Sequence, residues 1–481
     1  MKRRGAVRAG AVGAAVLLVA GALSPAAAQE TNSKRVVLTL RDAVKTAVAR
    51  SPEVKSTAFD VEVLLGKKQQ ADAARFPQIT SLGTIGPSPE AERQEPGGLP
   101  KALRSINTRE GTVTSAFGGA DFLLIQPIYT FGLISNLRAA AEHGVNAQRA
   151  GMDKTATEVA LRVREAYYGL LLFKDLKGLI GDLHEQLLKA ADRQETLLEG
   201  GFASEQDLFK LRTFQGELEK NLNLADRGLA IAREALRTWT GLDPGVEVGA
   251  ADERLAADLK EFPPVDVFVQ EARRNRPEFV QLREGIRAKR ALVEAERSKS
   301  WPMIFFGVQG SFAYAPNRDR ILNNAFVTDP LRHAFLGPVV GLKYDVDFGI
   351  TAGKIREAQA EVGKLESLQA SAEEGIPLQV QKAYGELVEA KRNVQVLERA
   401  WENAKKWVVT ALANADLGIG ETKDLADAIL AMAKTRADYF QAVFSYQMGV
   451  ARLDNAAGRD VEEIRALVAE ETEPLKVEIT R

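Results

Sequence analysis

The sequence has 481 residues, of which 45% are hydrophobic and 27% are charged, and this balance excludes a largely disordered chain. It contains no cysteine, which excludes disulfides, thiolate metal sites and cysteine nucleophiles. The formal net charge of −1 gives no reason to expect a nucleic-acid partner.

The first 28 residues have the three parts of a secretory signal peptide. Lys2, Arg3 and Arg4 precede a short apolar stretch, which is followed by three alanines ending at Ala28. Because the apolar stretch is shorter than a transmembrane helix, residues 1–28 are predicted to be a cleaved signal rather than a membrane anchor. No later segment is apolar for long enough to predict a membrane-spanning helix.

The rest of the chain has the pattern of one unit written twice. Pro52-Glu53 recurs 225 positions later, and several other landmarks recur after 217 positions. A constant spacing between similar segments indicates an internal repeat. We therefore predict a first repeat at 29–243, a connection at 244–262, a second repeat at 263–460 and a tail at 461–481. The landmarks that recur after 217 positions begin at Phe131, Gly201, Asp207 and Gly241.

Each repeat is predicted to begin with a helix, over 53–75 in the first copy, and to continue into a pair of β-strands, at about 78–131 and 303–348. Apolar residues alternate with small or polar ones in these segments, as in Ile304, Phe306 and Val308. The same pattern assigns Leu123, Ile125, Tyr129 and Phe131 to the apolar face of the first pair, and Val340 to Phe348 to that of the second.

An apolar face, a polar face and aromatic residues at the strand ends are typical of strands in an outer-membrane barrel. A half-buried hairpin of a soluble protein shows the same alternation. Four strands cannot enclose a pore, because the smallest such barrels have about eight strands, so a barrel requires several chains. The aromatic residues expected at the membrane interface are Phe76, Phe131, Trp301 and Phe348.

The longest predicted elements are two antiparallel helical hairpins, at 132–240 and 349–458. In the first, apolar residues step by three and four along 132–199 and 205–240, as in coiled coils. The longer helix would span about 100 Å, which is more than a globular domain of this size can bury. Pro377 falls inside the second long helix, where we expect a kink.

The sequence contains only weak matches to the motifs of enzymes and ligand sites. "GIGETK" at 418–423 lacks the spacing of a phosphate loop, and "DFG" at 347–349 has no accompanying kinase motif. The histidines, His143, His184 and His333, are widely separated in the sequence. We therefore expect no enzymatic activity, no metal site and no cofactor.

Four segments together resemble the outer-membrane efflux protein family, the TolC-like channels. They are "LTLRDAVKTAVARSPEV" at 38–54, "QPIYTFG" at 126–132, "YDVDFG" at 344–349, and the paired turns "GFASEQDL" and "GIGETKDL". The resemblance implies a mainly helical fold with a β-barrel part. A homotrimer would combine four transmembrane strands per chain into a twelve-stranded barrel, above a periplasmic α-barrel made of the duplicated hairpins.

The resemblance also implies partners and roles. The two turns would contact a periplasmic adaptor (membrane fusion) protein, which joins the channel to an inner-membrane pump of the RND or ABC type. Asp424 and Asp427 would form an acidic ring at the entrance, although a solvated helix face explains the same pair. Some relatives lock this entrance with a Tyr and an Arg, where this chain has Ala415 and Gly420. The residues expected to contact the adaptor are Gly201, Phe202, Ala203, Asp207, Gly418, Ile419 and Gly420.

The sequence thus predicts a passive exit duct for efflux or type I secretion, in the outer membrane of a Gram-negative-type bacterium and extending into the periplasm. Two alternatives are a periplasmic coiled-coil adaptor and a purely structural coiled coil. An adaptor would have one hairpin between lipoyl-like halves, and a structural coiled coil would not need the alternating segments. The pattern leaves the cargo and the pump class open.

Overall fold

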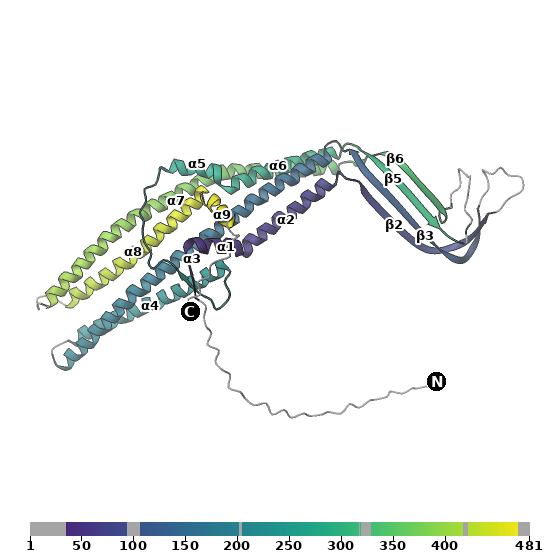
Figure 1. The fold of residues 1–481 in the computed structure, drawn as a ribbon. Coiled ribbons are helices and arrows are strands. Elements are labelled where there is room, and N and C mark those ends of the chain that lie inside the picture. Colours follow the sequence, from purple (N-terminus) through teal and green to yellow (C-terminus); the bar gives the residue numbers. More distant parts are fainter. Residues whose placement is uncertain are drawn as a thin grey trace, which may run out of the picture.

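The computed structural model describes residues 35–93, 106–201, 204–316, 318, 329–416 and 422–469. The described chain is elongated, with a β-sheet at one end, two helical hairpins at the other, and small elements midway (Figure 1). The predicted signal peptide at 1–28 lies outside the described residues. Within the described part, no helix has the length and hydropathy to cross a membrane.

The helices of the two repeats have equal lengths. Helices α2 (Pro52–Ala73) and α6 (Pro277–Ser298) each have 22 residues. Helices α3 (Leu133–Glu199) and α7 (Ile350–Asp416) each have 67 residues, and α4 (Glu205–Thr240) and α8 (Thr422–Ala457) each have 36. This duplication confirms the prediction of a mainly helical chain built from two copies of one unit.

The long helices pack in antiparallel pairs, α3 with α4 and α7 with α8. α2 and α4 lie against different parts of α3, so together they cover most of its length. A buried hydrophobic cluster joins both pairs near the middle of the molecule, and the long helices are held together there. It includes Val163 and Tyr167 of α3, Val380 and Leu387 of α7, and Val443 and Leu453 of α8.

Helix α7 continues without interruption through Pro377. Proline removes one N–H donor from the helical ladder. The neighbouring side chains of Ile376 and Val380 are buried in the central cluster, so packing holds the helix together at this point. The proline therefore does not divide the helix.

The sheet has four antiparallel strands in the order β2-β3-β5-β6. They are β2 (Gln78–Arg93), β3 (Ile106–Tyr129), β5 (Met303–Tyr314) and β6 (His333–Lys343). The prediction of four strands is confirmed, and within the described residues β2 and β6 each pair with one strand only. These two outer strands therefore present unpaired edges.

Strand β6 ends at Lys343, so the predicted extension of the strand to Phe348 is wrong. The segment that follows β6 caps the beginning of α7 (Ile350–Asp416). The Asp347 carboxylate accepts hydrogen bonds from the backbone N–H groups of Gly349, at 3.2 Å, and Thr351, at 2.9 Å. A carboxylate that caps a helix satisfies N–H groups that have no partner within the helix.

The two faces of the sheet differ in polarity, but the predicted face of Leu123 and Ile125 is wrong. Leu123 lies opposite Gln309, whereas Leu124 lies opposite Val308. An irregularity between Pro127 and Tyr129 shifts the alternation by one residue, and such a shift moves side chains to the other face. Residues that share the apolar face are Ile79, Phe122, Leu124, Phe306, Val308, Phe312, Leu336 and Val340.

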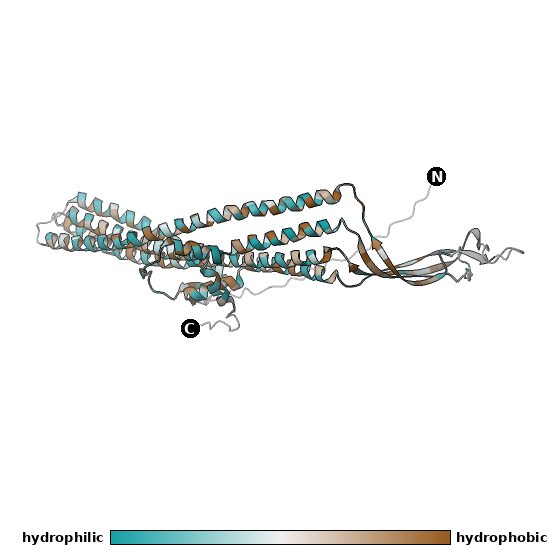
Figure 2. Cartoon of the chain, turned by 90° about the horizontal axis from the view of Figure 1, so that it is seen from above, coloured by the Kyte–Doolittle hydropathy of each residue, from teal (hydrophilic) through white to brown (hydrophobic). Residues whose placement is uncertain are grey.

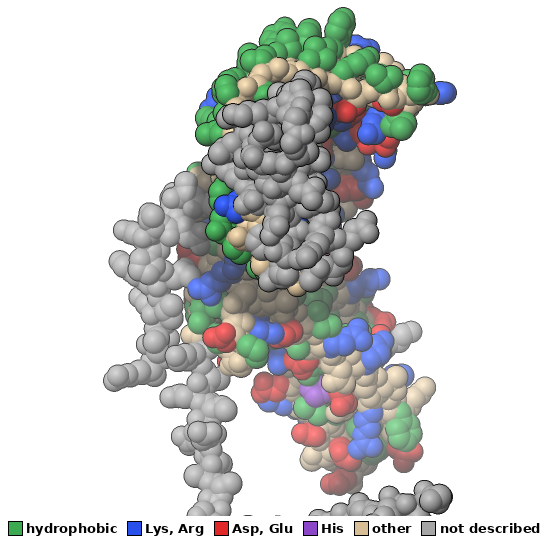
Figure 3. Space-filling view, turned by 90° about the vertical axis from the view of Figure 1, so that its right-hand side faces the viewer, with side chains coloured by type: hydrophobic (Ala, Val, Ile, Leu, Met, Phe, Trp, Pro, Cys, Tyr) green, Lys and Arg blue, Asp and Glu red, His purple; other side chains and the backbone are tan. Residues whose placement is uncertain are grey.

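The opposite face carries a polar group of side chains. The Ser311 hydroxyl lies 2.6 Å from Asp121 Oδ1 and 2.6 Å from His333 Nε2. Figure 2 shows the strands to be rich in hydrophobic residues compared with the helices. In Figure 3, seen from the sheet end, hydrophobic side chains gather along one side of this end, while charged side chains gather further back.

The midway elements are short and come from remote parts of the sequence. Strands β1 (Arg35–Leu38) and β4 (Glu247–Ala250) pair in parallel, and helices α1 (Leu40–Arg50), α5 (Val265–Asn275) and α9 (Asp460–Ala469) pack beside the long helices. The sequence analysis missed the β1–β4 pair, because four-residue strands give too little alternation to recognise.

Candidate gate, hairpin tips and strap

The tip of the first hairpin is a sharp turn at Gly201. Its φ of +77° lies in the left-handed region, which glycine adopts without a steric cost. A Cβ added to Gly201 would meet no atom within 4 Å, so the backbone is open to an approaching partner. Ser204 begins α4, since its hydroxyl accepts a hydrogen bond from the Gln206 N–H at 3.2 Å.

Most other predicted tip residues cannot be placed. Asp207 lies in the first turn of α4, and its side chain is outside the description. The adaptor contact therefore stays a prediction at these positions. Phe202, Ala203, Gly418, Ile419 and Gly420 lie outside the described residues.

The two predicted gate acids lie at the start of α8. Asp424 is in its first turn, and both Asp424 and Asp427 are exposed. Asp424 Oδ1 accepts a hydrogen bond from the indole Nε1 of Trp407 on α7, at 3.3 Å. Within the described part of the chain, Asp427 has no hydrogen bond or ion pair.

Sequence reasoning missed Trp407, which lies 17 residues before Asp424. Trp407 is 42% exposed, although tryptophan is usually well buried. The available signal was a tryptophan near the end of a predicted helix, six residues after Trp401. The first hairpin has its own polar contact across 17 residues, from Arg212 Nη2 to Glu195 Oε1 at 2.9 Å.

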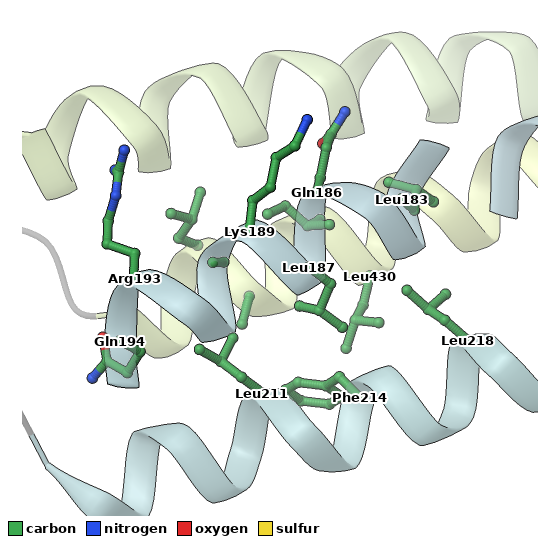
Figure 4. A pocket seen from close by; sticks show the side chains of 14 residues that line it. Leu183, Gln186, Leu187, Lys189, Arg193, Gln194, Leu211, Phe214, Leu218 and Leu430 are labelled. Atoms are coloured by element: carbon green, nitrogen blue, oxygen red, sulfur yellow. The ribbon is translucent and has the colours of Figure 1, made fainter. Parts of the chain in front are cut away.

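Near the tips, the two hairpins leave an apolar cavity of about 450 Å³ between them. Figure 4 shows leucine side chains and Phe214 meeting there from α3, α4 and α8. Leu425, Ile429 and Leu430 of α8 line this cavity, and Asp424 and Asp427 do not. The acids therefore lie on another face of α8 from the side chains that turn toward the first hairpin.

The predicted interface aromatics all lie where helices meet strands. Phe131 and Trp301 stack with ring centroids 5.5 Å apart, and Tyr129 contacts Phe131 edge-on at 4.6 Å. Phe76 carries the Arg75 guanidinium 4.8 Å from its ring centroid, and Phe348 is fully exposed. The structure thus brings two of the four predicted aromatic residues together.

An extended segment at 251–264, which we call the strap, joins the two repeats. Its first part contacts α3: the Tyr167 hydroxyl donates to Asp252 Oδ2 at 2.7 Å, and the Leu255 N–H donates to Asp175 Oδ2 at 2.9 Å. Burial raises the pKa of both Tyr167 and Asp175. These contacts fix the beginning of the strap on the first hairpin.

The second part of the strap contacts the other hairpin. The buried Tyr446 hydroxyl on α8 donates to the Asp258 carbonyl oxygen at 2.9 Å and accepts from the Lys260 N–H at 2.9 Å. Lys391 Nζ on α7 lies 2.6 Å from Glu261 Oε1. The strap therefore links both hairpins midway along their length.

A buried carboxylate lies beside the strap region, at the start of α9. Asp460 is 1% exposed, and its Oδ2 receives a hydrogen bond from Arg164 Nη1 at 2.5 Å. Burial raises the pKa of Asp460 to about 6, against the opposing effect of Arg164. In the described residues, no group of His, Cys, Asp and Glu is arranged to hold a metal ion.

Comparison with known proteins relates the first repeat to one family. Residues 43–242 match the family described as outer membrane efflux protein. The first repeat of the chain thus resembles this family. The match covers most of the first repeat, and the second repeat has helices of the same lengths. No curated protein matches the chain.

Solved outer-membrane channels share the fold of this chain. The outer-membrane channel OprN has 16% identity and a TM-score of 0.71, over 87% of this chain and 89% of that one. The CmeC outer membrane channel of Campylobacter jejuni has 12% identity and a TM-score of 0.69, over 95% and 99%. The MtrE outer membrane channel of Neisseria gonorrhoeae has 14% identity and a TM-score of 0.66, over 89% and 90%.

Proposed function

We propose that this protein is a passive outer-membrane exit duct, which conducts substrates from a periplasm-spanning pump to the exterior without a catalytic step. One observation supports this above all. The sheet has one apolar face, an opposite face that mixes polar with apolar side chains, and two unpaired edges, and it lies at one end of helices of 67 residues. No single copy of such a sheet satisfies its own edges.

Unpaired edges require neighbours in a membrane, because lipid offers no hydrogen-bond partners. Three copies would join β2 of one chain to β6 of the next and close a barrel of twelve strands. The apolar face would meet outer-membrane lipid, and the group around Ser311 would face the wet interior. The hairpins would then line up as a tube in the periplasm.

The docking and gating roles follow from the same arrangement. The turns at Gly201 and at 418–420 would meet a periplasmic adaptor, which connects the duct to an inner-membrane pump of the RND or ABC type. Asp424 and Asp427 from three copies would form an acidic ring at the periplasmic entrance. Like charges held close together attract cations, so the ring would bind multivalent cations and restrict passage.

An adaptor or a structural coiled coil is the competing class, and two measurements discriminate. We expect the mature protein to fractionate with the outer membrane as a heat-sensitive trimer. In planar bilayers, the purified trimer should produce stepwise ionic currents. A water-soluble monomer, or a membrane-bound protein without conductance, would contradict the proposal.

A further inference from the structure

Trp407 and Asp424 are joined by a hydrogen bond, which we call the tie. Trp407 lies near the end of α7 and Asp424 at the start of α8, so this hydrogen bond crosses the hairpin beside its tip. Tryptophan combines a large apolar ring with one N–H donor, and its ring is stiff compared with other long side chains. It is therefore suited to hold a carboxylate at a fixed place.

The tie makes the two gate acids unequal. Asp424 is hydrogen-bonded to the indole, whereas Asp427, which is also exposed, has no partner in the described part of the chain. Asp424 also lies in the first turn of α8, where the helix dipole favours a negative charge. A tethered carboxylate loses less side-chain entropy when it binds a cation than a free one does.

We propose that Trp407 is a positioning residue of the gate, which holds the Asp424 carboxylate in the orientation that binds a blocking cation. This inference rests on the proposed acidic gate. Under this proposal, a hydrogen bond within one chain orients a gate residue of the second hairpin. The Glu195–Arg212 ion pair braces the first hairpin in a comparable way but involves no gate residue.

The first test measures the contact without requiring a channel. In a variant with Trp239, Trp301 and Trp401 replaced by phenylalanine, Trp407 is the sole source of indole fluorescence. Asp424→Ala should shift the emission maximum, because the N–H loses its charged acceptor, and Asp427→Ala should leave it unchanged. An unchanged emission maximum in the Asp424→Ala variant would refute the tie.

The second test is a double-mutant cycle on cation block in planar bilayers, with Mg²⁺ as the probe. Trp407→Phe keeps an aromatic ring and removes the donor, and it should weaken block about threefold, as expected for one exposed hydrogen bond. In an Asp424→Ala background the same substitution should have no further effect. In an Asp427→Ala background the threefold loss should persist.

Controls separate a failure of this inference from a failure of the proposed function. Glu195→Gln breaks the brace of the first hairpin and should leave block unchanged. Independent effects of Trp407→Phe and Asp424→Ala on a conducting, Mg²⁺-blocked channel would overturn the positioning role alone. A protein that forms no channel would overturn the proposed function, while the fluorescence measurement would still decide the tie.

Discussion

At the scale of single residues, the acids at the start of α8 carry the sharpest expectation. Replacing both Asp424 and Asp427 by alanine removes the exposed charges of the proposed ring. We expect Mg²⁺ block in planar bilayers to weaken by at least about tenfold, since a cation then loses its attraction to the entrance. The matched control is Asp438→Ala, an exposed acid further along α8, which should retain block. Unchanged block in the double variant would locate the cation elsewhere.

A second residue-scale prediction concerns Asp460, whose pKa is raised to about 6 by burial. A carboxyl group with a raised pKa takes up a proton on folding, so its stabilising contribution is complete below about pH 4 and is lost as pH rises through 6. The full effect is on the order of 3 kcal/mol.

The charged groups facing Asp460 are Arg164, Asp454 and Glu463. We expect Asp460→Asn to remove its share of the pH dependence. The midpoint of urea unfolding, measured from pH 4 to pH 7, should therefore vary less with pH in the variant than in the parent protein. Equal slopes in the two proteins would show that Asp460 ionises normally in the folded state.

At the scale of elements, helices α4 and α8 end in the same way in the two repeats. Gly241 and Gly458 occupy equivalent positions, with φ of +63° and +73°. A Cβ on Gly458 would lie 3.0 Å from backbone atoms of Asn275 and Arg276, so the glycine also permits close packing against the end of α5.

Gly458→Ala should therefore destabilise the protein by more than the cost of the backbone conformation, which is about 1 to 2 kcal/mol. Gly245→Ala is the control, because Gly245 has φ of +95° with no atom within 4 Å of the added Cβ. The comparison uses urea unfolding of both variants. Equal losses of stability in the two variants would mean that the contact with α5 adds no cost to the Gly458→Ala substitution.

The strap offers a matching test of hydrogen bonding. Tyr446→Phe leaves the Lys260 N–H and the Asp258 carbonyl without their buried partner, which should cost about 1 to 3 kcal/mol. Tyr384→Phe removes a hydroxyl with no hydrogen bond within the described residues and should cost much less. Hydrogen exchange at the strap amides should accelerate in the first variant and not in the second.

The sequence predicted the long helices well because their apolar periodicity is sustained over dozens of residues, and α4 was placed at its observed bounds. Local irregularities escaped it. The shift near Pro127 reversed the assignment of Leu123 and Ile125, and no periodicity reveals where an alternation slips by one residue. Trp407 escaped for a different reason. Its partner lies across a turn, so the contact depends on how two helices align rather than on either helix alone.

At the scale of the whole molecule, the two faces of the sheet should respond differently to charge. Val340 lies on the apolar face and is 74% exposed, and Gln309 lies on the other face. Val340→Arg should reduce the amount of heat-sensitive trimer in the outer membrane, because an arginine facing the lipid midplane costs about 2 to 4 kcal/mol. Gln309→Arg should be tolerated. Equal tolerance at both positions would contradict a lipid-facing sheet.

The equal helix lengths of the two repeats have a consequence for stoichiometry. The two hairpins have long helices of equal length, yet their tips differ in sequence, as "GFASEQDL" and "GIGETKDL" show. Three such chains would present six hairpin ends of two alternating kinds. The ends would follow a sixfold spacing around the ring, but each kind of tip would recur only three times. A ring of six identical partner molecules would therefore occupy two classes of site, and titration should reveal two affinities, each saturating at three partners per channel.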